Sequence, residues 1–360
     1  MKHPALKILP IFAAIALASG AQAAGIVTNG TVALGVQDSG ALNVSGGSTI
    51  YGPAYTSPGS GTVGGTGVRG LFANGTSGYE ATYPGCLCEG WGAGWTDGTT
   101  STSGYDGNGT SNISLVSSVF GTDSNGYGTA TTVVTIGGAL EVTHEFKASA
   151  LTSFLYQVDV TLKNISGADL GSGANGLRYT RLMDFDTEPT AFSEFITIGG
   201  HPATNLLGTN DDGFEPADPF YAFKSGISCP EDANFVDCGP NDHGARFDFG
   251  FNALLGTDDA TTAEDETIKK ITIFYGAAPT ESDAIAALGA VGAEVYALGQ
   301  CNNALNDACS TSSGAPITYI FGFQGVGGTS IGDPTVPEPA SLALLGLGIA
   351  GLAWSRRKAA

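Results

Sequence analysis

Three carboxylates at alternate positions in the middle of the chain are its best candidates for chemistry. They are Asp184, Asp186 and Glu188, with Pro189 directly after them. On an extended chain, residues at this spacing project to the same side. Converging carboxylates can bind calcium, which takes about six to eight oxygen ligands. They can also form the acid and base of a glycosidase, which needs two carboxyls about 5 to 9.5 Å apart. The plainer interpretation, solvated acids at the end of a strand, is favoured.

A second acidic segment can complete such a site. It reads Asn210-Asp211-Asp212-Gly213 and continues to Glu215 and Asp218. No cofactor is indicated by a motif, and calcium at the three carboxylates is the one alternative to having none.

Aromatic residues gather before these acids, among many glycines. Trp91 and Trp95 are the largest of them, and Tyr79, Tyr83 and Tyr105 lie nearby in the sequence. Exposed rings of this kind can stack on sugars. They can equally form a small satellite core under a long loop, and this second interpretation is favoured.

The chain has six cysteines, an even number, which in an exported protein indicates disulfides. Two pairs, Cys229 with Cys238 and Cys301 with Cys309, close short loops and are predicted to be local bonds. The third pair, Cys86 and Cys88, has one residue between its members, so a direct bond is strained and other pairings stay open. A zinc site is disfavoured because no second cysteine or histidine pair lies at zinc spacing.

No complete catalytic motif is found. The segment 328–332 matches the nucleophile pattern GxSxG, but no strand is expected before it and no helix after it. His144 precedes Glu145, yet Ala148 stands where a zinc protease needs its second histidine, and the stretch reads as a strand. His201 and His243 fall in predicted loops. The chain is therefore predicted not to be an enzyme.

Composition excludes some partners. Between Gly25 and Val336 there are 33 acidic and 9 basic residues. Such an acidic surface disfavours nucleic acid and anionic lipid as partners and favours dispersal in water. The 55 glycines indicate many tight turns.

Hydrophobic periodicity predicts an all-β fold. Residues 140–147 and 154–163 alternate between apolar and polar side chains, which is typical of half-buried antiparallel strands. Further strands are predicted at 177–186, 194–198, 245–251, 267–275 and 317–323, and one helix at 281–298. We therefore expect an antiparallel β-sandwich with long glycine-rich loops and one late surface helix.

The N-terminus reads as a secretory signal peptide, residues 1–24. Lys2 and Lys7 precede an apolar stretch, and Ala21-Gln22-Ala23 supplies small residues at the positions that signal peptidase reads. Cleavage is expected after Ala23 or Ala24. The exported domain is then predicted at 25–325, followed by a glycine- and proline-rich spacer at 326–336.

The C-terminus, 337–360, has three parts in order. Pro337-Glu338-Pro339 precedes an uncharged apolar run, 340–354, and the basic cluster Arg356, Arg357 and Lys358 follows. The run is barely long enough to span a bilayer, and the basic cluster would stay cytoplasmic.

This tail resembles the PEP-CTERM sorting signal of Gram-negative bacteria that make exopolysaccharide. The resemblance implies transient insertion in the inner membrane, cleavage by an exosortase near the Pro-Glu-Pro triplet, and delivery to the cell surface or the medium. A plain membrane anchor is the alternative.

Two functions remain open at this point. The first is a non-catalytic structural or adhesive protein of the cell surface or extracellular matrix, with signal peptidase and exosortase as processing partners and exopolysaccharide as a further candidate partner. The alternative is a carbohydrate-binding or polysaccharide-degrading protein that uses Trp91 and Trp95 or the carboxylates.

Overall fold

The computed structural model describes residues 24–55, 64–72, 78–85, 89–107, 109–222, 228–258, 265–305, 309 and 315–332. The predicted signal peptide up to residue 23, Cys86 and Cys88, and the tail from residue 333 onward lie outside the described residues. Among the residues that are described, no helix is long and apolar enough to cross a membrane.

One layer of the fold is a nine-stranded sheet, and all of its neighbouring strands pair antiparallel. Its strands, in spatial order, are β11 (Ile113–Thr122), β12 (Gly128–Ile136), β13 (Leu140–Ala148), β14 (Leu155–Asn164), β20 (Ile268–Ala278), β22 (Thr318–Gln324), β21 (Val295–Gln300), β16 (Glu194–Gly199) and β18 (Phe235–Asn241).

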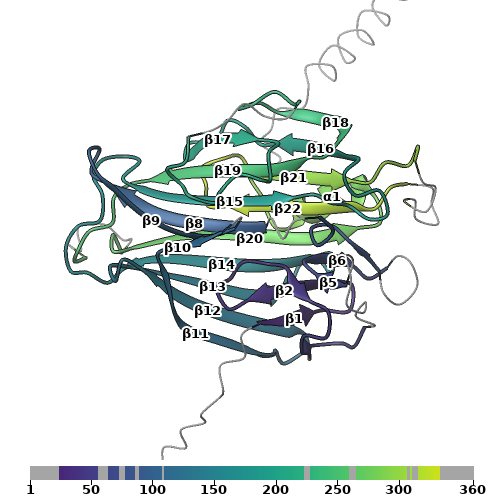
Figure 1. The fold of residues 1–360 in the computed structure, drawn as a ribbon, viewed down its shortest axis with the longest axis horizontal. Helices are drawn as coiled ribbons and strands as arrows, with labels where there is room; N and C mark the ends of the chain where they lie inside the picture. Colours follow the sequence, from purple (N-terminus) through teal and green to yellow (C-terminus); the bar gives the residue numbers. More distant parts are fainter. Residues whose placement is uncertain are drawn as a thin grey trace, which may run out of the picture.

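The opposite layer consists of smaller sheets (Figure 1). A six-stranded sheet has the order β10 (Thr110–Ser111), β9 (Ser101–Asp106), β8 (Glu89–Thr96), β15 (Leu177–Asp184), β19 (Gly244–Phe251) and β17 (Leu206–Asn210). A five-stranded sheet has the order β4 (Ile50–Tyr51), β1 (Ala24–Thr28), β2 (Val32–Gln37), β6 (Val68–Gly70) and β7 (Tyr79–Glu80). In this sheet β1 and β4 run parallel. A small pair joins β3 (Val44–Ser45) to β5 (Gly65–Thr66).

Aromatic side chains fill the space between the layers. The rings of Phe247 and Phe249 on β19 lie 4.9 and 4.8 Å from the ring of Phe323 on β22. Phe321 is 5.5 Å from Phe247, edge to face. These contacts between opposite sheets confirm the predicted β-sandwich, because its core is made by the inward faces of both layers.

The single helix, α1 (Glu281–Ala290), covers the outer face of the nine-stranded sheet. Its buried residues Ala284, Ala287 and Leu288 pack with Phe274 of β20 and Ile320 of β22. The side chain of Thr280 caps the helix by accepting a hydrogen bond from the backbone N–H of Asp283. Because of this cover, β22 and the second half of β20 are buried on both faces.

The helix is shorter than the predicted range 281–298. It ends at Ala290, and residues 295–300 form strand β21. Gly292, at φ +66°, supplies the left-handed backbone that ends the helix. The apolar residues after Gly292 were interpreted as one helical face, whereas they alternate between the two buried faces of a strand.

The first part of the predicted spacer is packed against the body. Val326 is buried, and the carboxylate of Glu294 accepts hydrogen bonds from the backbone N–H groups of Gly325, Val326 and Gly328 at 2.9–3.0 Å. Ile331 donates its N–H to the carbonyl of Ala293. A free spacer can therefore begin only after residue 332.

Candidate metal centre

Two of the three predicted ligands meet at one end of the sandwich. Asp184 is the last residue of β15, and Asp186 follows two positions later. They converge with Asp242, which lies between β18 and β19, and one carboxylate oxygen of each residue lies within 4.8 Å of the others. We call Asp184, Asp186 and Asp242 the aspartate cluster. Asp184 and Asp186 are fully buried, and Asp242 is half-buried.

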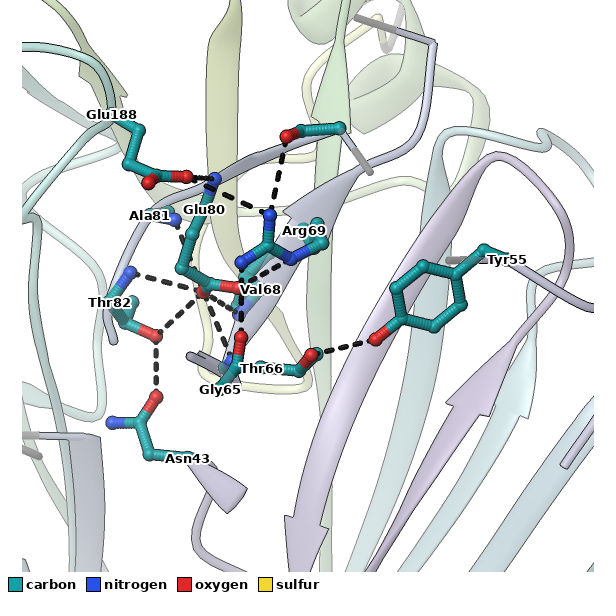
Figure 2. A network of polar contacts seen from close by, with 12 residues as sticks. Asn43, Tyr55, Gly65, Thr66, Val68, Arg69, Glu80, Ala81, Thr82 and Glu188 are labelled. Carbon is teal, nitrogen blue, oxygen red and sulfur yellow. Dashed lines mark hydrogen bonds and ion pairs between the residues drawn. The ribbon is translucent and has the colours of Figure 1, made fainter. Parts of the chain in front are cut away.

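Glu188 does not join the aspartate cluster, so the predicted trio is wrong in this member. The chain turns after Asp186, and the N–H of Glu188 donates to the carbonyl of Glu80. The Glu188 carboxylate accepts the N–H of Glu80 at 2.8 Å and lies 3.7 Å from the Arg69 guanidinium. Figure 2 shows Glu188 in this separate network. The two-residue spacing rule fails here because the backbone is no longer extended.

Glu194, at the start of β16, lies next to the aspartate cluster. Its Oε1 accepts the backbone N–H of His243 at 2.7 Å, and its Oε2 accepts that of Ser193 at 3.0 Å. Burial raises the pKa of Glu194 to about 9, and the negative charges of Asp186 and Asp242 contribute to the rise, against these two hydrogen bonds. The carboxyls at this end of the sandwich therefore disfavour one another's charged forms.

The pKa values of the aspartate cluster are raised for the same reasons, burial and neighbouring negative charge. Burial, followed by the charge of Asp242, raises the pKa of Asp186 to about 7. Burial also raises the pKa of Asp184, with Asp186, Asp242 and Glu194 adding to it. Burial raises the pKa of Asp242, and His243 opposes this. Without a counter-charge, these carboxyls hold protons that ordinary aspartates release.

The second acidic segment is engaged elsewhere. Asp211 accepts hydrogen bonds from the N–H groups of Ser228 and Cys229, and its Oδ2 lies 3.0 Å from His243 Nδ1. Glu215 contacts Arg246 at 3.2 Å. Asp212 and Asp218 accept the N–H groups of Phe214 and Phe220 in their own turns. None of these acids is part of the described aspartate cluster, although Gly213 packs against the backbone of Asp184.

The predicted local disulfides are present. Cys229 is bonded to Cys238, and Cys301 to Cys309. Cys229, Cys238 and His243 lie close enough to hold a metal ion. Because both sulfurs are in the disulfide, they are not free to bind one.

The two tryptophans have different surroundings. Trp91, on β8, is fully buried and donates its indole N–H to the carbonyl of Ser39 at 3.0 Å. Its ring belongs to the core and offers no exposed face to a sugar. Trp95, further along β8, is partly buried against the same core. The predicted pair of stacking rings is therefore not brought together on one surface.

His144 is part of the core, as predicted for a packed strand residue. Its Nε2 lies 3.1 Å from the Tyr179 hydroxyl, and its ring centroid is 4.7 Å from that of Trp91. Burial, with a contribution from Arg181, holds the pKa of His144 well below its ordinary value. The folded chain therefore keeps this histidine neutral.

We expect His144→Gln to weaken the acid sensitivity of the protein. In the wild type, the unfolded chain binds a proton at His144 below about pH 6.5 and the folded chain does not, so the contribution of His144 to stability falls as the pH drops. Between pH 7 and pH 5 this loss is about 2 kcal/mol. Urea unfolding at both values should show a loss smaller by that amount in His144→Gln, whereas the control His201→Gln should match the wild type. An unchanged loss in His144→Gln would contradict this assignment.

Sequence reasoning missed Asp242 and Glu194. A signal for Asp242 was present, because strands 177–186 and 245–251 were both predicted. Their antiparallel pairing places Asp184 opposite Gly244, so that an acid just before the second strand lies near Asp184. No comparable local signal pointed to Glu194.

Comparison with known families concerns the tail. Residues 335–358 match the PEP-CTERM protein-sorting motif. The chain carries a PEP-CTERM sorting signal. The PEP-CTERM motif is the recognition signal of exosortase, and it implies an exported protein that is sorted through a membrane-anchored C-terminus. No curated protein matches the chain.

Proposed function

We propose that this protein is a non-catalytic structural or adhesive component of the cell surface or extracellular matrix of an exopolysaccharide-producing bacterium. The observation that carries the proposal is the PEP-CTERM motif at 335–358. Signal peptidase removes residues 1–23, and exosortase cuts near Pro337. The β-sandwich then acts outside the inner membrane.

A non-catalytic role is supported by how the candidate catalytic groups are used. His144 is enclosed in the core, and His243 is buried and paired with Asp211. Ser330, the serine of the GxSxG match, follows β22 in the segment that packs beside Gly292. The two histidines are therefore part of the packed interior.

An adhesive role is supported by the edge strand β11, which pairs only with β12 in the nine-stranded sheet. It exposes Leu115, Val116 and Val119, whose side chains are 47, 58 and 56 % accessible. An edge strand of this length that has no charged residue and exposes apolar side chains is typical of a contact surface.

Intact mass spectrometry tests export and processing. We expect the protein in the medium to begin at Ala24, because cleavage after Ala23 keeps the whole of β1, whose Ala24 pairs with Gln37. Its C-terminus should lie near Pro337. Recovery of the medium form with Ala360 still attached would contradict the proposal.

A matched pair of variants locates the signal. Replacing Pro337, Glu338 and Pro339 by alanine should leave the full-length chain in the membrane fraction. The control Pro334→Ala lies just outside the matched residues and should be released like the wild type. Normal release of the triple variant would show that the triplet does not direct processing.

A further inference from the structure

The aspartate cluster differs from the other buried acids of this protein. Elsewhere in the described part of the chain, buried carboxylates lie beside a buried arginine, except Asp211, which lies beside His243. The pairs are Arg69 with Glu80 (Figure 2), Arg181 with Glu89, and Arg246 with Glu215 and Asp248, at 2.6–3.3 Å. Each of these carboxylates therefore has its counter-charge in the fold.

No such arginine is present beside Asp186 and Glu194. Among the described residues, neither of them forms a salt bridge, and the charges that act on them are those of other acids. His243, next to Asp242 in the sequence, directs its Nδ1 to Asp211. The fold gathers negative charge here without supplying a positive side chain.

Asp186 differs most from these arginine-paired carboxylates. Its side chain is fully buried, and no N–H or hydroxyl group of the described residues donates to either of its oxygens, which lie beside the carboxyl of Asp184. Oδ1 of Asp242 is also buried without a hydrogen-bond donor among the described residues. A buried carboxylate without a partner is costly, because it has lost water and gained nothing in return. These oxygens point to a ligand that supplies positive charge.

The backbone closes tightly around these oxygens. Gly85 has φ +82°, and a Cβ at this position would lie 2.5 Å from Oδ2 of Asp186. At Gly213, a Cβ would lie 2.6 Å from Cα of Asp184. Glycine lets the main chain approach the Asp186 carboxylate at Gly85 and the Asp184 backbone at Gly213, where a side chain would collide.

We propose that Asp184, Asp186 and Asp242 bind one divalent cation, and that calcium is the preferred ion. Glu194 acts as a positioning residue, because both of its oxygens accept backbone N–H groups, and one of these belongs to His243, next to Asp242. Carboxylate oxygens at irregular positions suit calcium, which accepts a flexible shell, whereas magnesium demands a near-ideal octahedron and keeps its waters. Zinc prefers nitrogen and sulfur ligands, and the neighbouring Cys229 and Cys238 are in a disulfide.

The cation would join the two layers of the sandwich. Asp184 ends β15 of the six-stranded sheet, and Glu194 begins β16 of the nine-stranded sheet. Asp242 lies on the connection between β18 and β19, which passes from one sheet to the other. The site does not depend on the sorting role, so each proposal can fail without the other.

The first test uses the exported chain after its metals have been stripped with a chelator. Calorimetric titration with calcium should show one site per chain. The unfolding temperature in excess calcium should exceed that in chelator by about 5 °C or more, because a ligand that binds only the folded state stabilises it. No binding and no shift would overturn the proposal, and an equal shift with magnesium would overturn the preference for calcium.

Variants then assign the site. Asp186→Asn should lose at least ten-fold in calcium affinity, yet its unfolding temperature in chelator should equal or exceed that of the wild type, because one buried charge is gone. The control Asp97→Asn changes an exposed loop acid and should keep the full calcium response. Should Asp186→Asn fail to fold, the half-buried Asp242→Asn provides the same comparison. A wild-type response in both cluster variants would overturn the site.

Discussion

Replacing Arg181 with methionine is expected to destabilise the protein by about 3–5 kcal/mol, which lowers its unfolding temperature by about 10 °C. Arg181 and Glu89 are fully buried between the sheets, 2.6 Å apart. Glu89 also accepts the Tyr275 hydroxyl at 2.7 Å and the N–H of Leu42 at 2.6 Å. Without the guanidinium, a buried carboxylate remains with too few donors. Thermal and urea unfolding measure the loss.

A second variant separates charge from packing. In the double variant Arg181→Met with Glu89→Gln, no uncompensated charge is left, so part of the lost stability should return. The exposed pair Lys147 and Asp159 provides the control, because Lys147→Met should cost less than about 1 kcal/mol at the surface. If Arg181→Met lost no more than Lys147→Met, the buried pair would not hold the layers together.

Gly276→Ala is expected to be almost as damaging, although it adds a single methyl group. Gly276 lies in β20, between β14 and β22 in the nine-stranded sheet. A Cβ there would be 1.9 Å from the carbonyl oxygen of Phe154 and 2.8 Å from a methyl carbon of Leu155. Backbone cannot move aside as a side chain can, so we expect a loss of about 3 kcal/mol or more, read from the urea midpoint.

Gly121→Ala is the matched control in the same sheet. Its Cβ would meet nothing closer than Oγ1 of Thr129, at 3.7 Å, and its φ is not positive. Alanine there restricts the unfolded chain, so stability should be unchanged or rise by up to about 1 kcal/mol. Equal effects of the two substitutions would show that the close approach at Gly276 is not real.

Hydrophobic periodicity predicted the strands well where one face of the strand is exposed to solvent. Residues 140–148 and 155–164 alternate between buried and more accessible side chains, as the sequence pattern required. The strand 244–251 is buried throughout. There, Arg246 and Asp248 face a loop whose carbonyls at Pro216 and Asp218 accept the guanidinium. A loop that is distant in the sequence therefore covers the polar side of this strand at Arg246.

Prediction from neighbouring residues was least accurate where the chain turns or where other strands bury it. The spacing of Asp184 and Asp186 correctly predicted that they lie together. Glu188 follows a turn and lies beside Arg69 instead. The sequence around Trp91 favoured a small satellite core under a long loop, whereas Trp91 lies on β8, between β9 and β15, and belongs to the main core. Neither outcome follows from neighbouring residues, because each depends on a strand far away in the sequence.

By itself, the sequence determined the sorting signal at 335–358, the two short-range disulfides and the β-sandwich class, because each is written in local spacing or periodicity. Only the tertiary structure decided which buried acids receive an arginine and which do not. Asp186 and Asp242 lie on segments that meet through the pairing of β15 with β19. The energy of a buried charge depends on everything packed around it, and that environment exists only after the sheets have closed.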